Sequence, residues 1–196
     1  MNKIFKKVFS LGLAVLALVV VFGFGTHKAE AVAISSAATG NWSAVATWTP
    51  AQVPVAGDTV TILTAHTVTV DVPSAAATVT INDPAATANG ITFGAGQSLT
   101  LTGALTLNGA SSTLASTVAV GAGTLSAASI SIVGGAGAGN SVVSVSTGTI
   151  TTTGSITPSG RAAGAQLTST GASNINIGGN LASTGSLTTG RTGTIT

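Results

Sequence analysis

The chain has 196 residues, no cysteine and few charged residues, with 6 Lys and Arg against 4 Asp and Glu. Four of the six basic residues precede residue 32, so the remainder carries two Arg and three Asp, a formal charge of −1. This composition provides no basic stripe for nucleic acid and no polybasic segment for an anionic membrane, and it excludes disulfides and thiolate metal sites.

Residues 1–31 have the organisation of a secretory signal peptide. Three lysines precede an apolar run at 11–25, and Ala29-Glu30-Ala31 supplies the small-residue cleavage site. The apolar run is short for a permanent span of a hydrocarbon core about 30 Å thick. We therefore expect cleavage after Ala31, contact with the membrane only before cleavage, and a mature protein that is secreted to the medium or the cell surface.

Residues 32–59 contain both tryptophans of the chain, within GNWSAVATWTPAQVPVAGD. This segment stands directly before the first alternating strand, where the open end of a stack of strands needs an atypical covering element. Each indole can cover up to about 200 Å² of an apolar end, the prolines donate no N–H to a further strand, and Gly-Asp favours a turn. The predicted structural cap comprises Trp42, Trp48, Pro54, Gly57 and Asp58.

From residue 60 to residue 196, aliphatic residues alternate with Thr or Ser in short runs separated by Gly, Asn, Asp and Pro. This alternation is the signature of β-strands, and almost any helical segment of about ten residues would have to cross a glycine or an alternating run. We therefore expect an all-β mature chain. The runs are VTI at 60–62, TVTV at 67–70, TVTI at 78–81, SLTL at 98–101, TVAV at 117–120, SISI at 129–132 and NINI at 174–177.

A strand, glycine, strand unit recurs along this region. Segments 98–106, 149–157 and 180–188 align without gaps, and 123–132 is a looser relative. The spacing between these segments is irregular, which is typical of a solenoid with a connection of free length in each coil. A sandwich would show longer strands and more hairpin dipeptides. The sequence predicts a single-stranded right-handed parallel β-helix (β-solenoid) of roughly six coils, each about 20 to 25 residues long.

The cap and the first strands together carry a recognisable arrangement of short motifs. Asn-Trp, Ala-Thr-Trp, Val-Pro, Ala-Gly-Asp-Thr-Val-Thr-Ile and His-Thr-Val-Thr-Val-Asp follow one another between residues 41 and 71. This arrangement resembles the opening of secreted bacterial β-solenoid surface proteins and, through them, the G8 domain. The resemblance implies an extracellular parallel β-helix with attachment, matrix or filament roles, often the first module of a longer chain. The matching residues are Asn41, Trp42, Ala46, Thr47, Trp48, Val53, Pro54, Gly57, Asp58, Val60, Ile62, His66, Val68, Val70 and Asp71.

Candidate chemistry is sparse. His66 lies between Asp58 and Asp71, but a metal site needs three or four converging ligands, and the mature chain offers one His and three Asp. Polysaccharide lyases and hydrolases are the enzymes to consider on this fold, and they need paired carboxylates or a basic residue beside acidic groups. No carboxylate follows Asp83. We therefore expect no catalytic, cofactor or metal site, with His66 at a turn or strand edge and the aspartates holding turns.

Two other features leave alternatives open. Arg161 and Arg191 each follow a Gly-Ser-aliphatic-Thr unit, and they form either a column that binds an acidic or phosphate group or a pair of solvated turn residues that discourage edge association. Thr-x-Thr pairs are similar to the ladders of solenoid ice-binding proteins. Their spacing along the sequence is not constant, however, and outward Thr is also ordinary strand surface.

The last residues up to Thr196 still follow the strand pattern, which predicts an open coil edge that another chain could extend. Our leading hypothesis is a secreted structural protein, a β-solenoid subunit of an extracellular filament or cell-surface matrix that assembles end to end as a homopolymer. Residues 32–41 would then pair with a neighbour's open edge. The alternative is the N-terminal part of a cell-surface adhesin, or a glycan- or ice-binding module with surface glycans as partners.

Overall fold

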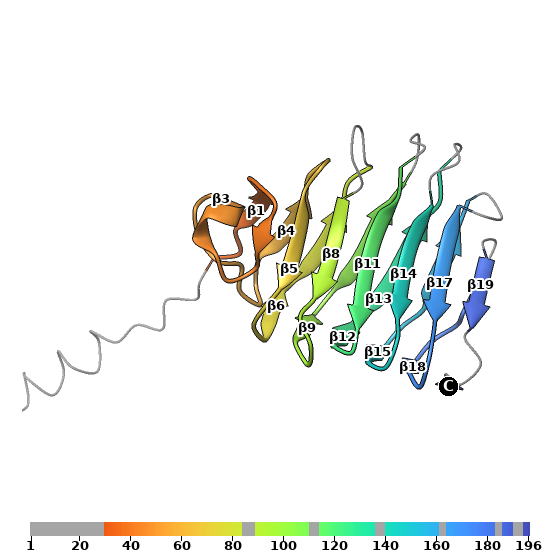
Figure 1. The fold of residues 1–196 in the computed structure, drawn as a ribbon. Coiled ribbons are helices and arrows are strands. Elements are labelled where there is room, and N and C mark those ends of the chain that lie inside the picture. Colours follow the sequence, from red (N-terminus) through yellow and green to blue (C-terminus); the bar gives the residue numbers. More distant parts are fainter. Residues whose placement is uncertain are drawn as a thin grey trace, which may run out of the picture. The chain divides into compact units, whose positions relative to one another are not determined.

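Figure 1 shows the computed structural model, which describes residues 30–83, 89–109, 114–135, 140–160, 164–182, 186–189 and 194–196. Residues 31–196 belong to one compact unit. As predicted, this unit is all-β and forms a parallel β-solenoid, with about five turns where roughly six coils were expected. Helical structure in the described residues is limited to the 3-10 turn η1 (Val45–Thr47), and no helix among them is long and apolar enough to cross a membrane.

The described strands form three sheets, which we name A, B and C. Sheet A contains β3 (Trp48–Thr49), β1 (Ala33–Ser36), β4 (Thr59–Ile62), β7 (Thr78–Ile81), β10 (Ala104–Asn108), β13 (Ser129–Val133) and β16 (Ile156–Ser159). Sheet B contains β2 (Gly40–Asn41), β5 (Thr67–Val70), β8 (Asn89–Phe93), β11 (Ser116–Gly121), β14 (Ser141–Val145), β17 (Ala165–Ser169) and β19 (Ser186–Thr189). Sheet C contains β6 (Ser74–Ala76), β9 (Ser98–Leu101), β12 (Thr124–Ala127), β15 (Thr149–Thr152), β18 (Asn174–Ile177) and β20 (Thr194–Ile195).

From β4 to β18 the chain passes through sheets A, B and C in turn, and each strand lies parallel to the strand one coil earlier. In Figure 1 the sheet B strands β5, β8, β11, β14, β17 and β19 follow one another along the stack. The one antiparallel pair among the described strands joins β3 to β1. A parallel ladder of this kind brings equivalent residues of successive coils directly above one another.

The length of the coils is more regular than the spacing of the aligned sequence segments indicates. Val79 pairs with Leu105, Leu105 with Ile130 and Ile130 with Ile156, so successive coils of this stretch have nearly the same length. The interval between segments 98–106 and 149–157 therefore spans two coils, and the looser segment 123–132 is the coil between. Segment 180–188 does not align with the others, because Leu181 forms a bridge to Ile156 in sheet A.

The segment before residue 60 contributes to the solenoid as well as to the cap. β1 pairs in parallel with β4, and β2 pairs in parallel with β5, so the first partial coil begins at Ala33. Residues 32–41 were expected to pair with a neighbour's open edge, but β1 and β2 pair within their own chain. The alternation in AISS is the same two-residue signal that predicted the later strands, and it explains why this short segment joins the sheets.

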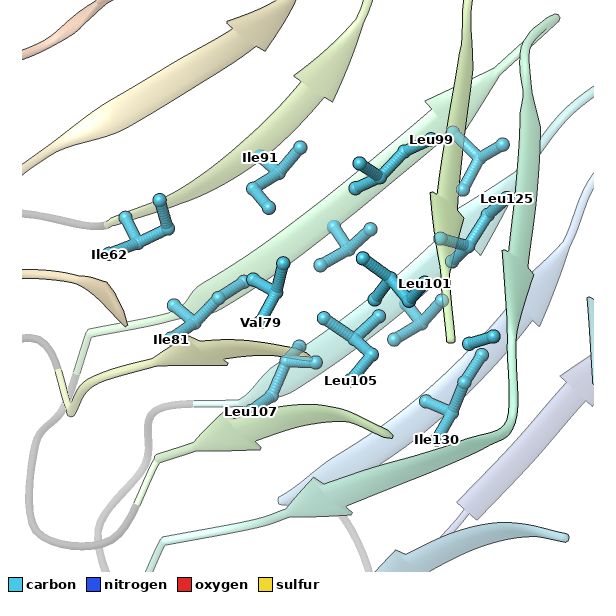
Figure 2. Close-up of a cluster of buried hydrophobic side chains, with 14 of the residues drawn as sticks. Ile62, Val79, Ile81, Ile91, Leu99, Leu101, Leu105, Leu107, Leu125 and Ile130 are labelled. Atoms are coloured by element: carbon cyan, nitrogen blue, oxygen red, sulfur yellow. The ribbon is translucent and has the colours of Figure 1, made fainter. Parts of the chain in front are cut away.

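Columns of aliphatic side chains fill the interior of the coils, as Figure 2 shows for the central coils. In sheet A the first inward position holds Val60, Val79, Leu105, Ile130 and Ile156, each no more than 1% exposed. The other two sheets contribute equivalent columns, which include Val118 and Leu125. Burying each such side chain is worth roughly 1.5 to 3 kcal/mol, so these columns are a main source of stability in a chain without cysteine.

Buried polar side chains occupy the corner between sheets A and B. At the start of the sheet B strands, the Ser116 hydroxyl lies 3.0 Å from Asn89 Oδ1 and 3.2 Å from the Asn108 carbonyl oxygen. One coil further on, the Ser141 hydroxyl donates to the carbonyl of Val133 at 2.8 Å. These side chains bind the last carbonyls of the sheet A strands as the chain turns toward sheet B, and the Val133 carbonyl also accepts the N–H of Gly109 at 2.9 Å.

We expect Ser116→Ala to destabilise the solenoid by about 1 to 3 kcal/mol, because it removes a fully buried donor. Ser144→Ala is the matched control, since Ser144 lies on the outward side of β14, and it should change the stability by no more than about 0.5 kcal/mol. Urea unfolding followed by circular dichroism measures both changes. Equal effects of the two substitutions would contradict a structural role for the corner.

Candidate functional site

The two tryptophans lie together at the N-terminal end of the solenoid. Trp42 is 1% exposed and Trp48 is 2% exposed, with ring centroids 5.0 Å apart and an interplanar angle of 70°. This edge-to-face arrangement is the favourable one for two aromatic rings. The Trp48 indole donates from Nε1 to the Trp42 carbonyl at 2.8 Å, whereas Trp42 Nε1 is buried without a partner among the described residues.

Short local hydrogen bonds fold the chain around these rings. After β2, the Ala44 N–H donates to the carbonyl of Asn41, and the Thr47 hydroxyl donates to the same oxygen at 2.8 Å. The Ala37 N–H donates to the Thr47 carbonyl at 2.7 Å. These contacts return the chain over β1, so that β3 pairs with it through Ser36 and Trp48 and occupies the outer edge of sheet A.

Asp58 closes the base of the cap. It is 1% exposed, and its carboxylate accepts the N–H of Val32 through Oδ1 and the N–H of Val55 through Oδ2, both at 2.9 Å. Asp58 therefore ties the start of the first coil to the loop before β4. Pro54 is buried in that loop, whereas Gly57 is exposed and has space around it for a side chain. Position 57 therefore does not require a glycine.

Removing either indole tests how the cap is held. Trp48→Phe deletes the donor to the Trp42 carbonyl, whereas Trp42→Phe deletes a donor that has no partner among the described residues. We expect Trp48→Phe to cost about 1 kcal/mol more in unfolding free energy. Thermal unfolding of both variants, followed by the fluorescence of the remaining indole, measures the difference. An equal or larger loss in Trp42→Phe would contradict this account.

Asp71 holds the other side of the cap. Its Oδ1 accepts the Ser43 N–H at 3.0 Å and its Oδ2 accepts the Ser43 hydroxyl at 2.5 Å. Desolvation on its own raises the pKa of Asp71, but the hydrogen bonds from the Ser43 side chain and backbone outweigh it and hold the pKa below its usual value. The contact links the turn after β2 to the end of β5.

A lowered pKa makes this contact sensitive to acid. Its contribution to stability is fully present above the unfolded-state pKa of about 3.9 and is lost as the pH falls through the folded-state pKa of Asp71. We expect the cap to loosen on acidification, with a change in tryptophan fluorescence. Asp71→Asn should lack that part of the pH dependence, and Asp58 is common to both proteins. An unchanged pH profile in Asp71→Asn would contradict the assignment.

His66 and Ser36 form the one close pair among the described residues that resembles a base beside a nucleophile. His66 Nδ1 lies 2.9 Å from Ser36 Oγ and 3.2 Å from the Ser36 carbonyl oxygen. Ser36 is fully buried, and its Oγ also accepts the N–H of Leu63 at 2.8 Å. The carboxylates of Asp58 and Asp71 bind backbone groups and Ser43 rather than His66. The pair closes the corner between β4 and β5.

No group of three or more His, Cys, Asp or Glu that could hold a metal ion occurs in the part of the chain that the structure describes. Arg161 and Arg191 lie outside the described residues, so their two alternatives stay open. The predicted signal peptide lies outside them as well, up to residue 29, while Ala31 at the predicted cleavage site is exposed.

The outward faces of sheets A and C carry columns of uncharged polar side chains. In sheet C, both outward columns run over five successive strands from β9 onward and contain Ser, Thr or Asn at every position. The first column is Ser98, Thr124, Thr149, Asn174 and Thr194, and the second is Thr100, Ser126, Thr151, Asn176 and Thr196. In sheet A, one unbroken column is Ser35, Thr61, Thr80, Thr106, Ser131 and Thr157.

Sheet B differs from these faces. Its outward positions include Gly90, Ala119, Val142 and Gln166 among the hydroxyl residues. The continuous columns of sheets A and C were not predicted from the sequence, because Thr-x-Thr pairs do not recur at constant spacing along the chain. Aligning the strands of successive coils, which have nearly constant length, would have revealed these columns.

No protein-family model, no curated protein and no solved structure matches this chain. The class of the protein is therefore defined by its fold, a parallel β-solenoid.

Proposed function

We propose that this chain is a secreted structural protein, a β-solenoid subunit of an extracellular filament or cell-surface matrix. The observation that carries the proposal is the division of the unit into a closed aromatic cap and coils with an aliphatic core and an uncharged polar exterior. A repeating stack of this kind provides length and stiffness by adding equivalent coils. The resemblance of residues 41–71 to secreted β-solenoid surface proteins supports the same role.

The outer surface of the cap supplies a contact for end-to-end assembly. Val45 in η1 is 48% exposed and Val55 in the following loop is 52% exposed, both high values for aliphatic residues. β3 already occupies the outer edge of sheet A, and Pro50 follows it without an N–H to donate. A neighbouring copy would therefore pack on the cap rather than continue the ladder of sheet A. Head-to-tail contacts that do not close into a ring produce filaments.

Electron microscopy of the purified protein over a range of concentrations tests this function. We expect filaments or extended rods of stacked subunits, and we expect Val45→Asp combined with Val55→Asp to shorten or abolish them, because two charges would be buried at the contact. Thr102→Asp combined with Thr153→Asp is the matched control, since both side chains are exposed at corners of later coils and not on the cap. Monodisperse monomers at the highest concentration would contradict the proposal.

A further inference from the structure

The outward face of sheet C, taken from β9 to β20, is the most uniform surface of the described residues. All ten positions of its two columns are Ser, Thr or Asn, and none carries a charge or an aromatic ring. The columns begin at β9, because β6 places Ala75 beside Thr100. The outward positions in β18 and β20 are exposed, as are Thr100 and Thr124, while the others are half-buried. The face is therefore open to solvent along these five strands.

Sheet B is an internal comparison, because it belongs to the same coils and has the same strand spacing. Its outward positions accept Gly90, Ala119 and Val142 without interrupting the ladder. The fold consequently does not require a hydroxyl or amide at every outward position. The uniform composition of sheet C calls for an explanation outside the packing of the coils.

The chemistry of this face restricts what it can bind. A charged partner gains nothing from it, and sugar rings lack the aromatic platforms on which they stack. Each hydrogen bond made to a ligand replaces one made to water, so an isolated small molecule would bind very weakly. Only an uncharged partner that repeats with the same period, and so contacts many ranks at once, would bind with useful strength.

The spacing of the ranks matches a tetrahedral network of water. Parallel strands lie about 4.8 Å apart, so equivalent hydroxyls of successive coils repeat at about that distance. Two oxygens that are each hydrogen-bonded at about 2.75 Å to one tetrahedral water lie roughly 4.5 Å apart. One water can thus bridge neighbouring ranks with nearly ideal geometry wherever their side chains do not bind each other directly. We infer that the outward face of sheet C is an ice-binding surface, a function beyond the structural role proposed above.

The second column is held rigid where its longer side chains lie. The Thr196 hydroxyl donates to Asn176 Oδ1 at 3.0 Å, and Asn176 Nδ2 lies 3.5 Å from Thr151 Oγ1. These contacts run along the stack and restrict the rotamers of Thr151, Asn176 and Thr196. Pre-organisation of this kind lowers the entropy lost when the face meets an ordered lattice.

Ice-affinity partitioning and inhibition of ice recrystallisation by the purified full chain test the inference. We expect the wild-type protein to concentrate in slowly grown ice. Thr149→Lys combined with Thr151→Lys should reduce this partitioning to the level of an unrelated soluble protein, because two lysines interrupt the centre of both columns. Val142→Lys combined with Ser144→Lys is the matched control on sheet B of the same coil, and it should retain wild-type partitioning. Circular dichroism establishes that both variants are folded.

Three results would overturn the inference. The first is wild-type protein that stays in the liquid phase, and the second is an equal loss of partitioning in the two folded lysine variants. The third is sheet C dependent binding to crystalline cellulose or chitin without binding to ice, which would assign the face to a polysaccharide. Filament formation in the absence of ice is measured separately, so failure here leaves the structural role intact.

Discussion

The parallel ladder between successive coils is the constraint on which the rest of this structure depends. It places each residue against its equivalent one coil earlier, so the inward and outward sets of side chains remain separate along the whole stack. A slip of one residue would turn every aliphatic side chain outward. The continuous aliphatic columns inside and the continuous outward columns are therefore two consequences of one register, whereas the uniform composition of the sheet C columns is not.

At the corners between the sheets, the alternation of inward and outward side chains is interrupted. Gly148 lies so close to the coil below that an added Cβ would stand 2.1 Å from the Gly123 carbonyl oxygen. At the corner between sheets A and B, the hydroxyls of Ser116 and Ser141 bind the last carbonyls of the sheet A strands. The side-chain requirements are thus strictest at the corners, where either a Cβ is excluded or a donor is needed.

Much of this architecture could be predicted from local pattern, and the remainder depends on contacts between coils. Two-residue alternation was sufficient to predict β4, β5, β7, β9, β11, β13 and β18, whereas β8, β14 and β17 were not among the predicted runs. The tryptophans were expected to cover the end before the coils, and both are buried at that end. The regular spacing of the coils was not recognised, because segment 180–188 was aligned out of register. Segment 123–132 appeared only as a looser relative, because Ala128 stands at the corner where Gly103 and Gly154 stand in neighbouring coils. The contact between His66 and Ser36 joins residues that are far apart in the sequence and had no local signal.

The capped end and the outward face of sheet C are independent surfaces of one stack. In a solenoid each coil contacts only its neighbours, so the aliphatic columns stabilise the coils whatever the outward side chains are. End-to-end assembly through the cap would bring further copies of the sheet C columns into one particle. The number of ranks that can meet an ordered lattice at the same time then rises with filament length, and weak contacts accumulate through multivalency. The structural role and the inferred binding role therefore reinforce each other, although neither requires the other.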